Sequence, residues 1–492
     1  MSGEVKLSDF IEIEKKYGLY DDMIEGINYW VYSRFSIWSN IRTKQLNLGI
    51  PHHSQKMSLI QKVITAGELL KNFMYKGGDL KKDVDICFLN HPRRVKAGEF
   101  YECIYTDQLA KQYENYLVLE HPYQFGHLKP VLTKNLFYSD DIAIKGNLYY
   151  IFYKKIYKKK YHELQEQIYK KIDEPLSEIE LKCDIVIDKG EITNIIAEHI
   201  LICKEKYKCY ERLINKINPK LVVEVVSYNM DCMIVNEICR KKRIVTIELQ
   251  HGTMNEHIPY QYAADSEIKQ FPQKIFVFSQ YWKECIKVPI SSEHIIVTGF
   301  PHFEKKVGEL ENKKLYNDEK INILFISQGT IGKELTKLAV ELAKKIDENK
   351  YRILYKLHPG EIPVWKELYP ELKNSTIEVL DTDKYSLYDY FAVSKIQIGV
   401  YSTALYEGLG FGLKTYIYRT GYASMMQRLS DMGYVSFVDN AEMLAHEIYR
   451  QENCDLSGAE FWESNALENM QNEINKCLKM KKEEKAINGI RE

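Results

Sequence analysis

The sequence has 492 residues, of which 45% are hydrophobic and 28% charged, with a formal net charge of −1 at pH 7. This length predicts two domains of a globular protein, and the near-zero charge provides no overall field that would attract nucleic acid. Because no run of about 18 apolar residues occurs and the charged N-terminus lacks the apolar core of a signal peptide, we expect a cytoplasmic protein.

The ten cysteines are scattered along the chain, without a CxxC pair or a Cys/His cluster at zinc spacing. They are expected to be small buried side chains in a reducing compartment. The sequence also has no Walker-type phosphate loop, no dinucleotide-binding glycine fingerprint and no HExxH motif. These patterns predict no cofactor and no metal site.

The first 80 residues are predicted to form a helical extension, followed by a domain over 81–300. Short apolar runs at 84–89 and 116–119 predict strands, and each ends in a polar loop, as strands do at the carboxyl edge of an open parallel sheet. In the first loop, Arg93 and Arg94 could hold an acidic acceptor, and Glu99 could deprotonate an acceptor hydroxyl. An exposed hinge loop is the equal alternative.

Residues 147–172 are rich in Lys and Tyr and begin a predicted helical insertion near 147–215. The pattern favours a helix with a solvated charged face and an aromatic stripe. The alternative is a basic, aromatic patch that lies on an anionic membrane surface, which would make the protein peripheral on the inner face of the membrane.

Strands are then predicted at 221–226, 244–249, 275–278 and 295–297. The second of these runs directly into Gln250-His251-Gly252-Thr253. Gly252 would let the backbone pass close to a ligand, and His251 is a candidate general base or phosphate partner. A loop histidine that is satisfied by backbone groups is the alternative.

The polar stretch 301–318 is predicted to link the domains. A second domain over 319–450 repeats the strand–loop–helix pattern, with strands at 321–326, 352–357 and 396–400, and C-terminal helices with a charged tail follow over 451–492. Alternation in both halves predicts an α/β fold of two doubly wound, Rossmann-like parallel sheets that face a cleft.

Two motifs of the second domain predict an anion site. Ser402 and Thr403 follow the strand 396–400 and begin a helix, whose free N–H groups favour a phosphate. Glu407 lies about one turn further and could accept hydrogen bonds from ribose hydroxyls. The alternative is that Ser402 only caps its helix and that Glu407 is a surface carboxylate.

The second motif is Lys356-Leu357-His358-Pro359-Gly360, at the end of the strand 352–357. His358 can donate a hydrogen bond or a proton to a leaving phosphate. Pro359 fixes the direction of the loop, and Lys356 lies beside it. Gln328 and Gly329, which follow the strand 321–326, are assigned to the same nucleotide-binding edge.

The combination of Gln250-His251-Gly252-Thr253, Lys356-Leu357-His358-Pro359 and Tyr401-Ser402-Thr403-Ala404 running into Glu407 resembles bacterial GT-B transferases of surface polysaccharides. The families nearest in motif are the bacterial sialyltransferases and polysialyltransferases, the capsule Kdo transferases and the CDP-glycerol glycerophosphotransferases. The resemblance covers about residues 84–440.

This resemblance implies that His358, Ser402 and Thr403 hold the phosphate of a donor nucleotide, and that His251 is the catalytic base. The acidic motif of the sialyltransferases is missing from the N-terminal half, so Glu99 is only a positional candidate. Asp381-Thr382-Asp383 has the DxD form that binds a divalent ion in another glycosyltransferase fold, but its place before a helix favours a turn.

The resulting expectation is a metal-independent glycosyltransferase that uses a nucleotide-sugar donor and a glycan or lipid-linked saccharide acceptor to build a surface or capsular polysaccharide. Three alternatives stay open: a CDP-alditol phosphotransferase, a nucleotide-sugar 2-epimerase, and a non-catalytic nucleotide- or glycan-binding subunit.

Overall fold

The computed structural model describes residues 6–45, 67, 71, 78–92, 94–122, 126–254, 257–382, 384–420, 423–450 and 458–488. Arg93 and Asp383, and 35 residues of the helical extension predicted over 1–80, lie outside these residues. Of the ten cysteines, nine are described; they are free thiols, and all but Cys285 are buried.

The N-terminal domain is built on a parallel seven-stranded sheet in the order β5-β4-β1-β6-β7-β8-β9. The chain order of the strands reverses between β1 and β6, which is where doubly wound sheets open for ligands. The strands are β1 (Ile86–Leu89), β4 (Tyr116–Glu120), β5 (Leu136–Tyr138), β6 (Leu221–Val225), β7 (Val245–Leu249), β8 (Lys274–Val277) and β9 (Ile295–Val297).

The C-terminal domain is built on a parallel six-stranded sheet in the order β12-β11-β10-β13-β14-β15, with the reversal between β10 and β13. The strands are β10 (Ile321–Ile326), β11 (Tyr351–Lys356), β12 (Glu378–Leu380), β13 (Ile396–Gly399), β14 (Lys414–Tyr418) and β15 (Val435–Val438). The predicted α/β fold of two doubly wound parallel sheets is confirmed, and this is the GT-B arrangement that the motifs indicate.

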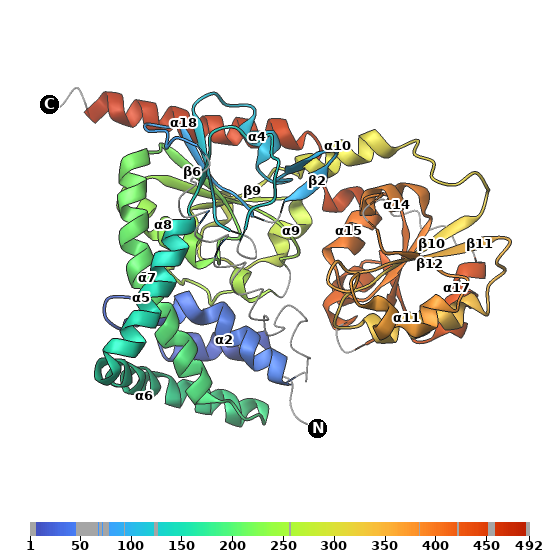
Figure 1. The fold of residues 1–492 in the computed structure, drawn as a ribbon, viewed down its shortest axis with the longest axis horizontal. Coiled ribbons are helices and arrows are strands. Elements are labelled where there is room, and N and C mark those ends of the chain that lie inside the picture. The colour runs from blue at the N-terminus through green and yellow to red at the C-terminus, as the bar shows by residue number, and fades with distance from the viewer. Residues whose placement is uncertain are drawn as a thin grey trace.

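The strands form because their apolar runs are buried on both faces of each sheet. In β1, for example, Cys87 and Leu89 face the helices α7 (Lys189–Ile217) and α8 (Met230–Lys241). Ile86 and Phe88 face α4 (Asp107–Ala110) and α18 (Ala466–Asn488). Figure 1 shows α18 lying across the N-terminal sheet, although it is the last helix of the chain. A short antiparallel hairpin of β2 (Val95–Ala97) and β3 (Phe100–Glu102) follows β1.

The helices that cover or connect these sheets vary from single turns to long rods. They are α4 (Asp107–Ala110), α8 (Met230–Lys241), α9 (Gln280–Cys285), α10 (Pro301–Leu310), α11 (Gly332–Ala343), α12 (Trp365–Leu368), α13 (Pro370–Lys373), α14 (Leu387–Val393), α15 (Thr403–Gly410), α16 (Gln427–Asp431), α17 (Ala441–Arg450) and α18 (Ala466–Asn488).

The stretch predicted as an interdomain linker is helical over its first part. Helix α10 begins at Pro301, a residue suited to the first helical turn, and it buries Phe303 and Leu310. In the sequence, charged residues separate these apolar positions, so the stretch shows no clear helical pattern. The connection between the domains is therefore residues 311–320.

The N-terminal helices pack with the Lys/Tyr-rich insertion as one unit. This unit consists of α1 (Leu7–Lys16), α2 (Tyr29–Gln45), α5 (Asp140–Ile156), α6 (Lys158–Cys183) and α7 (Lys189–Ile217). The helices share a separate apolar core at one end of the N-terminal domain (Figure 1). The buried Arg34 of α2 donates to Glu14 and to the carbonyls of Ile258 and Gln261, which fixes α2 beside the segment after β7.

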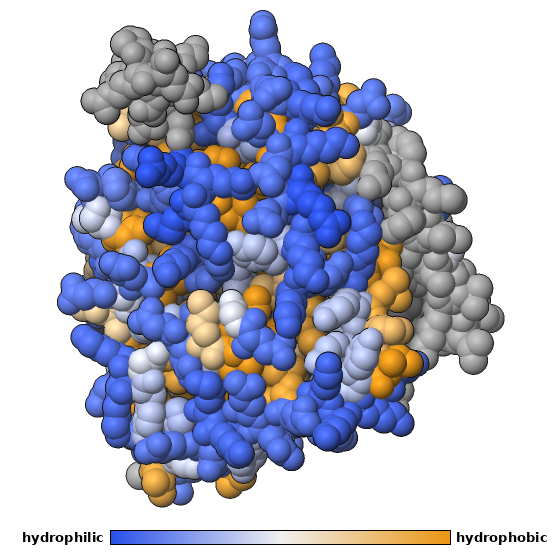
Figure 2. All heavy atoms as spheres, turned by 90° about the vertical axis from the view of Figure 1, so that its left-hand side faces the viewer, coloured by the Kyte–Doolittle hydropathy of each residue, from blue (hydrophilic) through white to orange (hydrophobic). Residues whose placement is uncertain are grey.

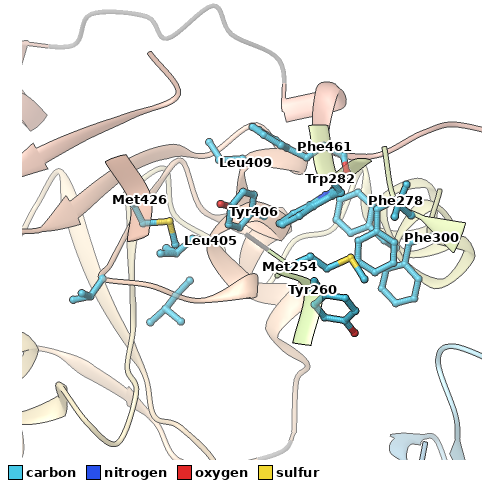
Figure 3. Packing of buried hydrophobic residues seen from close by; sticks show 14 of the residues in the cluster. Met254, Tyr260, Phe278, Trp282, Phe300, Leu405, Tyr406, Leu409, Met426 and Phe461 are labelled. Atoms are coloured by element: carbon cyan, nitrogen blue, oxygen red, sulfur yellow. Dashed lines mark hydrogen bonds between the residues drawn. The ribbon is translucent and has the colours of Figure 1, made fainter. Parts of the chain in front are cut away.

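An aromatic cluster joins the two domains and the returning C-terminal segment. Trp282 of α9 packs on Tyr406 of α15 with ring centroids 4.6 Å apart, and its indole N–H donates to the carbonyl of Phe461. Figure 3 shows Trp282 and Phe461 beside Tyr406 and Leu409, with Phe278 and Phe300 alongside. Among the described residues, no helix is both long and apolar enough to span a bilayer.

Candidate functional site

The carboxyl edges of the two sheets meet at two of the predicted motifs. The backbone N–H of Thr253, which follows β7, donates to the hydroxyl of Thr403 at the start of α15, at 3.3 Å. A Cβ on Gly252 would lie 3.5 Å from the same hydroxyl oxygen. Thr403 therefore faces the N-terminal domain, and the loop that carries His251 adjoins it.

In the C-terminal domain, the loops after β10 and β13 are joined at the switch point of the sheet. The side-chain carbonyl of Gln328 accepts a hydrogen bond from the N–H of Tyr401 at 3.3 Å. The hydroxyls of Thr330 and Tyr401 lie 2.6 Å apart. Gly329 is exposed between these contacts, so Gln328 and Gly329 lie at the same edge as Ser402 and Thr403.

The buried carboxylate of Glu361 holds two of these loops together. It accepts hydrogen bonds from the N–H of His358, at 2.7 Å, from the hydroxyl of Ser327, at 3.0 Å, and from the hydroxyl of Tyr369. Glu361 was not predicted, because a lone glutamate after a His-Pro-Gly turn gives no sign of being buried. Its three contacts fix the position of the His358 loop relative to β10.

The imidazole of His358 is held in one tautomer. Its Nδ1 accepts a hydrogen bond from the N–H of Gly360 at 3.1 Å, so in the neutral ring the proton lies on Nε2, which is then a donor. Pro359 is exposed, and Lys356 is half-buried as the last residue of β11. A donating Nε2 is suited to a phosphate oxygen.

Ser402 performs the capping role that was the alternative to phosphate binding. Its hydroxyl accepts from the N–H of Ala404 at 3.2 Å, which satisfies one of the free groups at the start of α15. A phosphate at this position would compete for that N–H. Ser402 and Thr403 are both half-exposed.

Glu407 does not lie free on the surface, contrary to the alternative. One of its carboxylate oxygens accepts a hydrogen bond from the hydroxyl of Tyr388 at 2.8 Å. Burial raises the pKa of Glu407 to about 7, while the Tyr388 hydrogen bond acts in the opposite direction. This carboxyl group therefore titrates near neutral pH.

His251 lies within a cluster of aromatic side chains at the end of β7. Its Nε2 lies 3.3 Å from the hydroxyl of Tyr228, and its buried Nδ1 has no hydrogen-bond partner among the described residues. Burial, with smaller contributions from His91 and His257, lowers the pKa of His251 to about 3. The imidazole is therefore neutral, and one of its nitrogens is unsatisfied.

Two further residues beside His251, Tyr228 and His257, were not predicted. The hydroxyl of Tyr228 also lies 3.4 Å from Nε2 of His257, so one tyrosine bridges two histidines. Phe35 of α2, which is 38% exposed, packs on Tyr228 with ring centroids 5.0 Å apart. Because these residues come from three separate segments, their proximity gave no sequence signal.

The expected acceptor-binding role of Arg94 is wrong for this structure. Its guanidinium is completely buried and pairs with Glu120, at 2.7 Å, and with Asp107, at 3.0 Å. Glu120 also lies 3.1 Å from Nδ1 of His127. Arg94 therefore ties the ends of β1 and β4 together, because a buried guanidinium needs paired carboxylates.

The candidate base Glu99 follows β2. It is exposed at the turn of the β2–β3 hairpin, and among the described residues no hydrogen bond or ion pair joins it to His251. Within those residues, no group of three or more His, Cys, Asp or Glu side chains is arranged to hold a metal ion.

Two surface hollows lie away from this edge, around β5. The larger, about 700 Å³, is lined by Lys81, Lys129 and Thr133, and the other is lined by Asp107 and Lys134 among others. Neither contains a histidine or any of the predicted site residues. The candidate site therefore remains at the meeting of the two sheet edges.

No protein-family model and no curated protein matches the sequence. Among solved structures, the chain is similar to UDP-GlcNAc 2-epimerase from Methanocaldococcus jannaschii, at 13% identity and a TM-score of 0.48 over 80% of this chain and 99% of that one. It is similar to the wall teichoic acid polymerase TagF at 12% identity and a TM-score of 0.44, over 86% and 99%. UDP-GlcNAc 2-epimerase from Neisseria meningitidis is 10% identical, with a TM-score of 0.44 over 80% and 99%.

Proposed function

We propose that this protein is a nucleotide-sugar-dependent glycosyltransferase that acts at the meeting edges of its two sheets. The observation that carries the proposal is the contact of the His251 loop with the start of α15, through Thr253 and Thr403. It brings a neutral imidazole with an unsatisfied nitrogen close to a helix start that favours an anion. The proposal extends to the synthesis of a surface polysaccharide, on the motif resemblance alone.

In this proposal the donor nucleotide binds the C-terminal domain. Its phosphate accepts a hydrogen bond from Nε2 of His358 and binds at Thr403, displacing the contact with Thr253. Its ribose hydroxyls donate to Glu407, in place of or beside Tyr388. Glu361 and the Gln328–Tyr401 contact hold the loops of the C-terminal domain in position before the nucleotide binds. Little reorganisation of these loops is therefore needed.

His251 is the proposed general base, acting through Nδ1. For Nδ1 to carry a lone pair, the ring proton must lie on Nε2, which then donates to the oxygen of Tyr228. The Tyr228 hydroxyl in turn donates to Nε2 of His257. Tyr228 is therefore a positioning residue, since it fixes the tautomer of His251.

The transfer step balances with these groups. The acceptor hydroxyl loses its proton to Nδ1 of His251 as its oxygen forms a bond to the anomeric carbon of the donor sugar. The bond from that carbon to the phosphate oxygen breaks, and the nucleotide leaves with the electron pair. The anionic donor raises the pKa of the neighbouring imidazole above its ligand-free value near 3.

A test of the proposed function begins with thermal shifts in CMP, CDP, UDP and GDP, because a ligand of the folded state raises Tm. Product analysis then separates the reactions: a glycosyltransferase consumes the donor only with an acceptor. A 2-epimerase releases a rearranged sugar without one, and a CDP-alditol phosphotransferase leaves a phosphodiester in the product. No shift with any nucleotide, or binding without turnover, contradicts the proposal.

Two variants test the assigned roles. His358→Ala should lower kcat by about 10²–10³ if Nε2 stabilises charge on the leaving phosphate. Tyr228→Phe should lower kcat and change its pH profile, with KM for the donor unchanged, because only the histidine tautomer is affected. Normal turnover by a folded His358→Ala protein would remove that residue from the mechanism.

A further inference from the structure

Helix α5 has a row of apolar side chains on its outer face. Leu148, Ile151, Phe152 and Ile156 are 59%, 44%, 53% and 61% exposed. Their spacing of three and four residues places them on one face of the helix. Tyr157, which joins α5 to α6, is 44% exposed beside them.

The opposite face of α5 is firmly packed. Tyr149, Tyr150 and Tyr153 contact the apolar core that α1, α2, α6 and α7 share. Gly146 lies against Ile202 and Lys206 of α7, so closely that a Cβ would be 3.0 Å from the Lys206 side chain. The helix is therefore anchored, and its outer apolar row is a fixed surface feature.

Lysines surround this row, and acidic residues are missing from it. Between residues 142 and 162 the sequence has six lysines and no Asp or Glu. Five of these lysines are exposed at the corner between the helices: Lys154, Lys155, Lys158, Lys159 and Lys160. We name this surface, residues 148–160, the α5–α6 corner.

The lysines of the α5–α6 corner are little neutralised. The ion pair of Lys159 with Glu163 is 3.9 Å long between side chains that are 93% and 59% exposed. Lys154 and Lys160 lie over the rings of Tyr150 and Tyr157 rather than against carboxylates. The corner therefore combines exposed apolar side chains with charged side chains that are all positive.

We propose that the α5–α6 corner docks the protein on the surface of a bilayer that contains anionic phospholipids. The apolar row would enter the headgroup region, and the lysines would lie among the lipid phosphates. A second copy of the chain is a poorer partner, because self-association would bring the lysines of two corners together. Nucleic acid would match the lysines but not the apolar row.

The position of the corner leaves the candidate site accessible. Figure 1 shows α5 and α6 at the side of the N-terminal domain away from the C-terminal domain. Figure 2 shows the face that carries them, where hydrophobic patches interrupt a mostly hydrophilic surface. The inference goes beyond the proposed function, since docking on a bilayer requires neither donor nor acceptor.

The test is co-sedimentation of the full chain with vesicles of phosphatidylcholine alone, or with about one-third phosphatidylglycerol. Binding is expected only to the anionic vesicles, and it should weaken as salt rises from about 0.1 M to about 0.5 M. Each lysine removed should lower the partition coefficient about fivefold. The variant Lys155→Gln/Lys158→Gln/Lys159→Gln should therefore lose about two orders of magnitude.

A matched control removes three exposed lysines from the C-terminal domain, as Lys337→Gln/Lys344→Gln/Lys373→Gln. It should bind vesicles like the unaltered protein. Phe152→Ser/Ile156→Ser should weaken binding without changing the net charge. The proposal is wrong if the corner and control variants bind vesicles equally. It is also wrong if the protein binds only neutral vesicles, or if the corner variants change only the oligomeric state.

Nucleotide thermal shifts of the same variants separate this inference from the proposed function. The corner lies outside the site, so the corner variants should keep any nucleotide-induced shift. Vesicle binding without nucleotide binding would support docking and contradict the transferase. Nucleotide binding without vesicle binding would contradict docking and support the proposed transferase.

Discussion

Glu407 is a site residue whose protonation changes near neutral pH. Burial raises the pKa of Glu407 from its ordinary value of 4.5 to about 7, and only the ionised carboxylate accepts hydrogen bonds with both oxygens. Nucleotide affinity should therefore rise about tenfold between about pH 6 and about pH 8. Isothermal titration calorimetry across this range checks the prediction.

The control for this pH dependence is Glu407→Gln, which keeps an acceptor oxygen but does not titrate. Because the nucleotide phosphate titrates in both proteins, the difference between the two profiles isolates Glu407. Stability should change in the opposite direction: the folded protein holds the Glu407 proton up to about pH 7, so this group's contribution falls as pH rises from about 4.5 to about 7. Parallel affinity profiles would show that Glu407 does not bind the nucleotide.

At the scale of elements, the start of α11 must approach the Glu361 carboxylate closely. A Cβ on Gly332 would lie 2.1 Å from the Tyr369 hydroxyl and 2.3 Å from Glu361 Oε1. Gly332→Ala should therefore displace the groups that hold the His358 loop. We expect a loss of about 1–3 kcal/mol in the free energy of unfolding, together with weaker nucleotide binding.

Gly308→Ala is the matched control, because Gly308 lies within helix α10 and a Cβ there meets no atom within 4 Å. It should stabilise the protein by about 0.5–1 kcal/mol. Denaturant unfolding and nucleotide titration of both variants check the comparison. If Gly332→Ala kept both stability and affinity, the loop would not depend on the Glu361 contacts.

At the scale of the whole molecule, Trp462 joins the domains through the returning C-terminal segment. Its ring stacks on Phe303 with centroids 4.0 Å apart, and its indole N–H donates to the carbonyl of Tyr406 in α15. Trp462→Ala should cost about 3–5 kcal/mol. It should also separate the unfolding of the two domains into two calorimetric transitions.

Trp365→Ala is the control, because Trp365 is similarly buried but donates to Asp381 within the C-terminal domain. It should lower the Tm of the single coupled transition without dividing it in two, because the aromatic cluster between the domains is unchanged. A single transition at the original Tm in Trp462→Ala would show that the aromatic cluster does not couple the domains.

The strands that carry the motifs could be predicted within about two residues, because buried parallel strands are unbroken apolar runs. The run at 221–226 became β6 (Leu221–Val225), and the run at 396–400 became β13 (Ile396–Gly399). The strands β5, β14 and β15 and the β2–β3 hairpin were not predicted. In β14, β15 and the hairpin, polar residues occupy part of each strand, so no unbroken apolar run marks it. Helix α10 was missed because its four charged residues lie between Phe303 and Leu310, which separates its buried apolar side chains in the sequence.

The sequence by itself determined the α/β fold and the loops that lie at the carboxyl edges of the sheets, because local apolar patterns specify strands and the chain direction specifies their ends. Only the tertiary structure decided which side chains meet. It buried Arg94 between Glu120 and Asp107, placed Tyr228 between two histidines, and brought Thr253 to Thr403 across 150 residues. Such contacts depend on packing between distant segments, and no local pattern records them.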